Sequence, residues 1–368
     1  MTQTQHRKDI QGLRALAVLL VVAGHFFPGV VQGGFIGVDI FFVVSGFVIT
    51  QQMLKSIELS HQKFLLNFYA RRIRRILPSA LLVTLVTIVV AKWLLGPVVA
   101  NSATLDGAWA TVFLSNFHFQ SIALDYFSTG TQVSPLQHYW SLSIEEQFYL
   151  VWPAIFLLLQ VKSISIKARK VVLTVIIAVS LFAALYQSTV TESAIFFSTL
   201  TRVWELAIGA LLAILAISIR VPRILLNICI GALVVSAFVI PQSMQWPRLT
   251  TVPIVALTSL ILMRNPRLDS SQPLENRAAT YIGDLSYIIY LWHWPVLTIA
   301  KGYFGKFEAP QILVCLTVTM FLSVLTHHLF ENPIRYSKKL ISSAMLTVSL
   351  GISSVVTVGF VLFTTYQG

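Results

Sequence analysis

The sequence predicts an all-α, polytopic membrane protein with about eleven transmembrane helices. Hydrophobic residues make up 56% of the chain and charged residues only 11%, whereas soluble domains average about a quarter charged. Apolar runs long enough to cross a hydrocarbon core of about 30 Å recur along the chain. Lys and Arg gather in alternate connecting segments, as they do in membrane proteins. These three observations exclude a water-soluble enzyme.

The apolar runs define the expected elements in order. The predicted spans lie near residues 13–32, 35–54, 76–95, 145–161, 169–187, 198–218, 223–241, 249–263, 280–300, 309–329 and 340–364. The first run lacks the short apolar core and cleavage site of a signal peptide, so we expect it to remain in the mature chain. We expect residues 1–339 to form one membrane domain of ten helices and residues 340–368 to add an eleventh.

The basic residues predict the orientation of these spans. With the N-terminus in the cytoplasm, twenty Lys and Arg residues fall in cytoplasmic segments, and three fall outside: Arg248, Lys301 and Lys306. Positive charge is retained on the cytoplasmic side, so the C-terminus is predicted to be outside. The long outer segment 97–143 contains no Lys or Arg. Its apolar stretch 109–119 is too short to cross, so we expect a re-entrant or surface-lying element.

The formal net charge of +12 is expected to serve membrane lipid rather than nucleic acid. A nucleic-acid binder gathers its basic residues on a polar domain, and this sequence contains no polar stretch of that length. Cys229 and Cys315 each lie in an apolar run. We therefore expect neither a disulfide framework nor a bound metal.

Ionisable residues inside the first two spans are candidates for function, because a charge at mid-membrane is costly. Arg14 and His25 are eleven residues apart, which places them on one helix face about 16 Å apart along the axis. Asp39, in the second span, is expected at a depth similar to that of His25. An aspartate that orients a histidine makes the ring a general base or a nucleophile. An interhelical hydrogen bond that only holds two helices together explains the pattern equally well.

Four arginines, Arg71, Arg72, Arg74 and Arg75, precede the third span. They are expected either to anchor the chain at anionic lipid headgroups or to bind phosphate oxygens through their planar guanidinium groups.

Glu145 and Glu146 are expected to begin the fourth span at the outer side. Helix capping, with Ser143 as the cap, is one interpretation, and binding of a substrate hydroxyl is the other. His118, Asp125 and Tyr126 lie in the same outer segment and could contribute.

Several other polar residues are given structural interpretations. Arg202 and Glu205, three residues apart, are expected to pair with each other within one helix. Asp284, Trp292 and His293 resemble an aromatic belt at the outer interface. His327 and His328 are too isolated to be predicted ligands.

Five motifs resemble those of the membrane acyltransferase 3 family. They are RKDIQGLRALAVLLVVAGH, GGFIGVDIFFVVSGFVIT, YARRIRRILP, HYWSLSIEEQFYLVWP, and YIGDLSYIIYLWHWP followed by ENPIRY. They occur in the family's order between residues 7 and 336. The family's Arg-x10-His signature falls on Arg14 and His25, and its Arg-x-x-Arg signature fits both Arg71/Arg74 and Arg72/Arg75.

The resemblance implies an O-acyltransferase of bacterial envelope polysaccharides, such as O-antigen or exopolysaccharide. It implies cytoplasmic acetyl-CoA as the donor and the inner membrane as the location. The arginines would bind the donor, and His25, Asp39, Glu145 and Glu146 would serve catalysis. The chain is most like the branch fused to a periplasmic SGNH domain, so a separate SGNH-type transferase is an expected partner.

Two other classes of function compete with an enzyme. A transporter or flippase of a glycan or acyl donor would use the charged residues to line a conduit, but it usually shows internal repeats, which this sequence lacks. A membrane scaffold would use them only to hold helices together.

Overall fold

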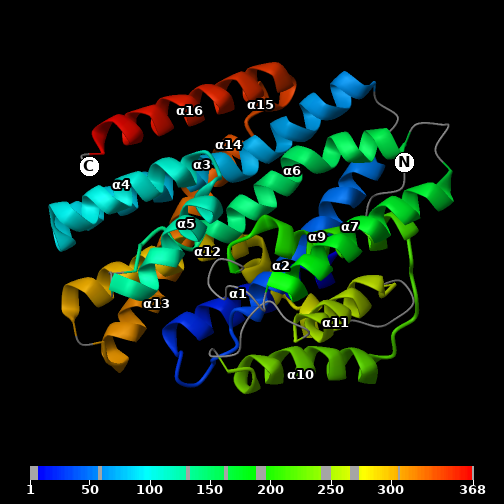
Figure 1. Ribbon diagram of the computed structural model, residues 1–368, viewed down its shortest axis with the longest axis horizontal. Coiled ribbons are helices and arrows are strands. Elements are labelled where there is room, and N and C mark those ends of the chain that lie inside the picture. The colour runs from blue at the N-terminus through cyan, green and yellow to red at the C-terminus, as the bar shows by residue number, and fades with distance from the viewer. Residues whose placement is uncertain are drawn as a thin grey trace. The chain divides into compact units, whose positions relative to one another are not determined.

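A computed structural model describes residues 7–56, 60–129, 133–160, 165–187, 196–241, 250–265, 273–305 and 307–366. The side chains of residues 123–129 lie outside the described part, and so do the candidate roles of Asp125 and Tyr126. Figure 1 shows helices throughout the described residues, which confirms the all-α prediction.

Each predicted span overlaps a helix, although the first, predicted at 13–32, is shifted towards the N-terminus in the structure. These helices are α1 (Lys8–Phe26), α2 (Ile36–Leu54), α3 (His61–Leu95), α6 (Tyr139–Leu159), α7 (Ile166–Gln187), α9 (Thr199–Leu215), α10 (Arg223–Val239), α11 (Thr251–Met263), α12 (Arg277–Phe304), α13 (Ala309–Thr326) and α16 (Ala344–Thr365). Within the described residues, seven helices are long and apolar enough to cross a membrane. The chain is therefore a polytopic membrane protein, while the number of spans and the sides of the termini stay predictions.

Two helices begin six or more residues before the start that the hydropathy pattern predicts. The third span was expected from residue 76, but α3 begins at His61 and continues through the four arginines and through Pro78. The fourth was expected from residue 145, but α6 begins at Tyr139. Hydropathy detects the apolar part of a helix and misses a polar part that protein contacts cover.

The first of two compact units contains residues 1–54 and 159–287. Its centre is α2, of which 72% is buried and which packs against α1, α9 and α11. Glycine makes the closest approaches possible: a Cβ atom on Gly46 would collide with the Leu206 carbonyl of α9, and one on Gly37 with the Ala17 carbonyl of α1. Side chains from all these helices form one apolar core around α2.

The second unit contains residues 55–158 and 288–368. In it, α4 (Pro97–Thr111), α3 and α16 lie side by side (Figure 1). The chain reverses at Gly96, whose φ of 87° suits glycine, and α4 then runs back along α3, so that Gly107 lies against Thr84 and Ile88. This return is consistent with the predicted re-entrant element, although its depth in the bilayer stays a prediction.

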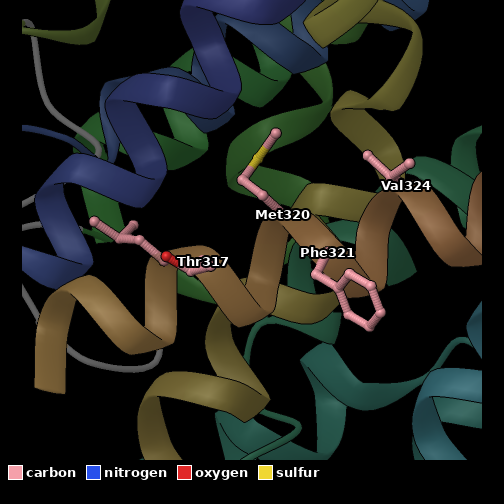
Figure 2. A pocket seen from close by; sticks show the side chains of 5 residues that line it. Thr317, Met320, Phe321 and Val324 are labelled. Carbon is pink, nitrogen blue, oxygen red and sulfur yellow. The ribbon is translucent and has the colours of Figure 1, made fainter.

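The second unit also has an extensive apolar exterior. Only 17% of α16 is buried, and its exposed side chains include Leu350, Val356 and Phe360. On α13, a hollow of about 530 Å³ is lined by Leu316, Thr317, Met320, Phe321 and Val324 (Figure 2). No ionisable side chain lines this hollow, so it suits contact with lipid chains better than acyl-transfer chemistry.

Candidate functional site

Helix α1 carries both members of the Arg-x10-His pair. It is continuous from Lys8 to Phe26, so the predicted spacing of about 16 Å between Arg14 and His25 on one face follows from helix geometry. Arg14 donates a hydrogen bond from Nη1 to Gln11 Oε1 at 3.3 Å. His25 lies in the last turn.

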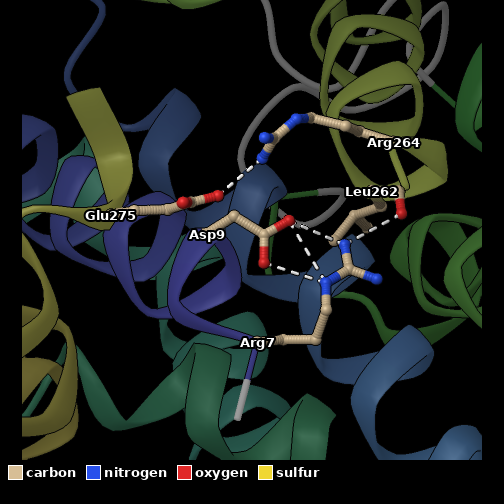
Figure 3. Close-up of polar contacts among 5 residues, drawn as sticks. All are labelled: Arg7, Asp9, Leu262, Arg264 and Glu275. Carbon is tan, nitrogen blue, oxygen red and sulfur yellow. Dashed lines mark hydrogen bonds and ion pairs between the residues drawn. The ribbon is translucent and has the colours of Figure 1, made fainter. Parts of the chain in front are cut away.

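The N-terminal end of α1 lies in a group of ion pairs within the first unit (Figure 3). The Arg7 side chain pairs with Asp9 at 2.8 Å and also donates to the Leu262 carbonyl at 3.2 Å. Close by, Arg264 pairs with Glu275 at 2.7 Å. Each of these arginines is matched by its own carboxylate, so this group has little surplus charge with which to bind an anion.

Asp39 belongs to a buried ion triad. Arg202 Nη1 donates to Asp39 Oδ1 at 2.7 Å and to Glu205 Oε1 at 3.1 Å. All three side chains are at most 1% exposed, and the Phe196 ring stacks on the guanidinium at 5.2 Å. The predicted pairing of Arg202 with Glu205 is confirmed, and Asp39 is a third member that the sequence did not indicate. That Asp39 orients His25 stays a prediction.

The four arginines of α3 separate into two pairs. Arg72 lies over the Tyr149 ring of α6 at 5.9 Å and interacts electrostatically with Glu146. Arg75, one turn further on, interacts with Arg72 and with two residues after α13, as described below. In contrast, Arg74 donates to the Leu340 carbonyl at 3.1 Å, and Arg71 interacts electrostatically with two other arginines, Arg74 and Arg72.

This separation distinguishes the two registers that both fit the Arg-x-x-Arg signature. Arg72 and Arg75 face ionisable groups of the protein, whereas Arg74 serves a backbone carbonyl. Anchoring at lipid headgroups therefore does not account for Arg72 and Arg75.

The expected placement of Glu145 and Glu146 is wrong. Since α6 begins at Tyr139, the two glutamates lie nearly two turns inside the helix, and Ser143 is not their cap. Ser143 Oγ instead donates to the Tyr139 carbonyl at 3.0 Å and accepts from the Ser115 amide.

The glutamates are also not at an outer rim opposite the arginines. Helices α3 and α6 run antiparallel, as hydrogen bonds from Tyr69 to the Leu150 carbonyl and from Tyr139 to the Ala80 carbonyl show. This register places Glu146 at the level of Arg72. Tyr149 donates to Glu145 Oε2 at 3.3 Å, which ties the first glutamate to the same group.

Glu331 and Arg335 were missed as functional candidates by the sequence analysis, which set His327 aside as too isolated. A π-helical segment, η2 (His327–Glu331), follows α13 and leads into α14 (Asn332–Arg335). Glu331 accepts from His327 Nδ1 at 2.9 Å and from Arg335 at 3.3 Å, and both Glu331 and Arg335 interact with Arg75. The available signals were the ENPIRY motif, which holds Glu331 and Arg335, and the i, i+4 spacing of His327 and Glu331. Irregular π-helical turns often occur at functional sites.

We call this group the arginine cluster. Its members come from α3, α6 and the η2–α14 segment of one unit: Arg72, Arg75, Glu146, Tyr149, Glu331 and Arg335. Glu145 is tied to this group by Tyr149 and Arg71 interacts with Arg72, so four guanidinium groups stand against three carboxylates and leave a positive surplus. Arginine offers paired donors that match phosphate oxygens, so the cluster is suited to a polyanionic ligand.

The predicted aromatic belt is wrong for Trp292 and His293, whereas Asp284 is exposed and its place at the outer interface stays a prediction. His293 is fully buried and its Nδ1 is bonded to the Tyr290 carbonyl at 2.6 Å, while Trp292 is 5% exposed and donates to Thr326 Oγ1. A buried Trp or His needs a polar partner, and α12 finds both partners inside the second unit.

Comparison with known proteins identifies the family. A family model described as an acyltransferase domain matches residues 7–328. The chain belongs to this acyltransferase family. The match includes Arg14, His25, the α3 arginines and His327, and it ends just before Glu331 and Arg335.

The relatives that carry a name are O-acetyltransferases. The chain is 33% identical to the peptidoglycan O-acetyltransferase OatA of Listeria monocytogenes, over 89% of this chain and 55% of that protein. It is 33% identical to the putative peptidoglycan O-acetyltransferase YrhL of Bacillus subtilis, over 90% and 56%. It is 28% identical to the O-acetyltransferase OatA of Staphylococcus aureus, over 91% and 58%. The chain thus spans little more than half the length of these relatives. No solved structure matches it.

Proposed function

We propose that this chain is a membrane O-acetyltransferase that takes an acetyl group from cytoplasmic acetyl-CoA and passes it towards a hydroxyl of an envelope polysaccharide. The arginine cluster is the observation that supports this proposal. It gathers surplus positive charge on protein-facing arginines, in a chain of an acyltransferase family. Acyl-CoA carries several phosphate groups and so matches this donor set.

Each residue of the cluster would have a separate role in binding the donor. Arg72 and Arg75 would bind phosphate oxygens, and Arg335 would add a third guanidinium. Glu331, which already accepts from Arg335, would hold that side chain in place, and Glu146 would limit the surplus charge so that the empty cluster is not strongly self-repelling. Glu145 would act only through Tyr149, to which it is hydrogen-bonded.

His25 would carry the chemistry in the first unit. It would act either as the general base or as a nucleophile that holds the acyl group for a moment. Arg14, on the same helix, would support donor binding at the cytoplasmic end, and Asp39 would influence His25 through the packing of α1 on α2.

The acceptor is proposed to be an envelope glycan. Peptidoglycan is the first glycan to test because it is named for two relatives. O-antigen and exopolysaccharide, expected from the family resemblance, come next. A separate SGNH-type transferase is proposed as the partner that completes transfer on the outer side of the bacterial inner membrane.

The experiment compares the two arginine registers. Binding of radiolabelled acetyl-CoA to purified protein in nanodiscs is measured by titration, and CoA release is followed in parallel. We expect Arg72→Ala/Arg75→Ala to weaken acetyl-CoA binding at least tenfold, since each charge-assisted hydrogen bond is worth about 1.5–3 kcal/mol. The matched control Arg71→Ala/Arg74→Ala removes the same charge and should weaken binding less.

An equal loss of acetyl-CoA binding in both double variants would show that the four arginines act only as general anchors. Transport of the intact donor or of a glycan without any release of CoA would favour the transporter reading instead.

A further inference from the structure

A second histidine–aspartate pair lies in the second unit, apart from the arginine cluster. His118 of α5 (Ser115–Thr129) and Asp106 of α4 are joined by Nε2 and Oδ1 at 2.8 Å. The hydroxyl of Ser134 donates to the other carboxylate oxygen, Asp106 Oδ2, at 2.5 Å. Both ring and carboxylate are largely buried, with 9% and 8% of their side chains exposed.

The surrounding backbone and rings fix this geometry. The Trp109 indole stacks on the His118 ring, with centroids 5.5 Å apart and planes within 9°. Phe113, between α4 and α5, has a left-handed φ of 55°, which is costly for a residue with a Cβ atom. Gln147 of α6 stabilises that turn by donating to the Phe113 carbonyl at 3.0 Å and to Asn116 Oδ1 at 2.7 Å.

The hydrogen bonds also determine which ring nitrogen carries the proton. The Leu136 amide donates to Ser134 Oγ at 3.1 Å, so the serine hydroxyl is oriented to donate to Asp106. An ionised carboxylate can only accept, and His118 must therefore carry its hydrogen on Nε2. Nδ1 is then a lone pair, and among the described residues no hydrogen-bond partner for it is found.

A histidine held in this way is arranged for proton transfer. The aspartate fixes the tautomer and stabilises the imidazolium ion that forms when Nδ1 takes a proton. A pair that only joined two helices would not need its second nitrogen left available. The charge pattern predicts that the α3–α4 reversal lies at the outer side. Because α4 returns from that reversal, the predicted orientation places the pair inward from the side where a glycan would arrive.

We propose that His118 is a catalytic general base for the acceptor half of the reaction, and this rests on the proposed function. His118 Nδ1 takes the proton of a glycan hydroxyl as its oxygen attacks the carbonyl carbon of the acyl group. A new carbon–oxygen ester bond forms, and the bond from that carbon to the atom carrying the acyl group breaks. The imidazolium then returns the proton to that leaving atom, so charge and atoms balance. Asp106 is a positioning residue.

The test separates donor and acceptor steps in the bacterium that carries the gene, where any partner protein is present. Alkali-labile acetate on the envelope polysaccharide reports transfer, with a deletion strain as the baseline. The first-turnover burst of CoA release, when inverted membrane vesicles are given acetyl-CoA, reports the donor step because it precedes transfer to the acceptor. The variants are His118→Gln and Asp106→Asn, and His61→Gln, an exposed histidine at the start of α3, is the matched control.

We expect His118→Gln to lower transferred acetate by about 10²-fold or more, the usual contribution of a general base, while CoA release stays within about twofold. Asp106→Asn keeps the size and the bond to Ser134, but its amide donates to Nε2 and moves the ring hydrogen to Nδ1, which abolishes the base. It should lower transfer at least tenfold, and adding imidazole to a His118→Ala strain should restore part of the transfer.

Other outcomes overturn the inference in distinguishable ways. Normal transfer in His118→Gln, or a parallel loss of CoA release in both variants, would assign the pair to structure only. A deletion strain with unchanged acetate and wild-type vesicles without CoA release would instead refute the proposed function, and with it this step.

Discussion

Replacement of Arg202 by methionine should destabilise the first unit strongly, whereas Asp39→Asn should hardly affect its stability. Arg202 donates to two carboxylates that are each 0% exposed. Removing one partner of a buried ion pair costs about 3–5 kcal/mol because an unpaired charge stays buried. At about 1.36 kcal/mol per factor of ten, the unfolding constant should rise by roughly 10²–10⁴-fold.

Asp39→Asn acts in the opposite electrostatic direction. The asparagine oxygen can still accept from Arg202, and the substitution removes one of the two carboxylates that share this guanidinium group. We therefore expect a loss of about 1 kcal/mol at most. If the Asp39 carboxylate also orients His25, the Asp39→Asn protein should lose more acetyltransferase activity than its small loss of folding stability would cause.

The assay uses a thiol reporter in the same unit. Cys229 is 1% exposed and belongs to the core around α2, so in a Cys315→Ala background its labelling rate in detergent, measured against denaturant, follows opening of that core. An Arg202→Met protein whose Cys229 is as well protected as in the parent would refute the charge argument. Equal destabilisation by Asp39→Asn and Arg202→Met would show that the triad acts through shape rather than charge.

Two further predictions concern α1 and α2. His25→Ala should abolish acetylation of the envelope polysaccharide while the protein is still made in normal amounts, and retained acetylation, measured as alkali-labile acetate, would exclude a catalytic role. Gly46→Ala should destabilise the first unit by about 1–3 kcal/mol through overpacking against Leu206. The control Gly231→Ala meets nothing within 4 Å and should be neutral or slightly stabilising in the same thiol-protection assay; an equal loss in both would contradict the packing argument.

Local pattern was sufficient for much of the fold. Each predicted apolar run overlaps a helix, and the positions of Arg14 and His25 on one helix and of Arg202 beside Glu205 follow from a periodicity of 3.6 residues. The start of α6 was missed because its first turns are polar and aromatic. They are covered by contacts such as that of Tyr139 with Ala80, which lie 59 residues apart in the chain.

The sequence by itself therefore determined the class of the protein, its helices and the ionisable residues that each helix carries, since these depend on composition and on repeats within one helix. Only the tertiary structure decided which helix faces meet. It assigned Arg72 and Arg75 to the cluster and Arg74 to a carbonyl, placed Glu146 level with Arg72, and joined Asp106 to His118. The physical reason is that close packing, set by glycine contacts and helix reversals, fixes the rotation and depth of each helix, and a single helix contains no information about its neighbour.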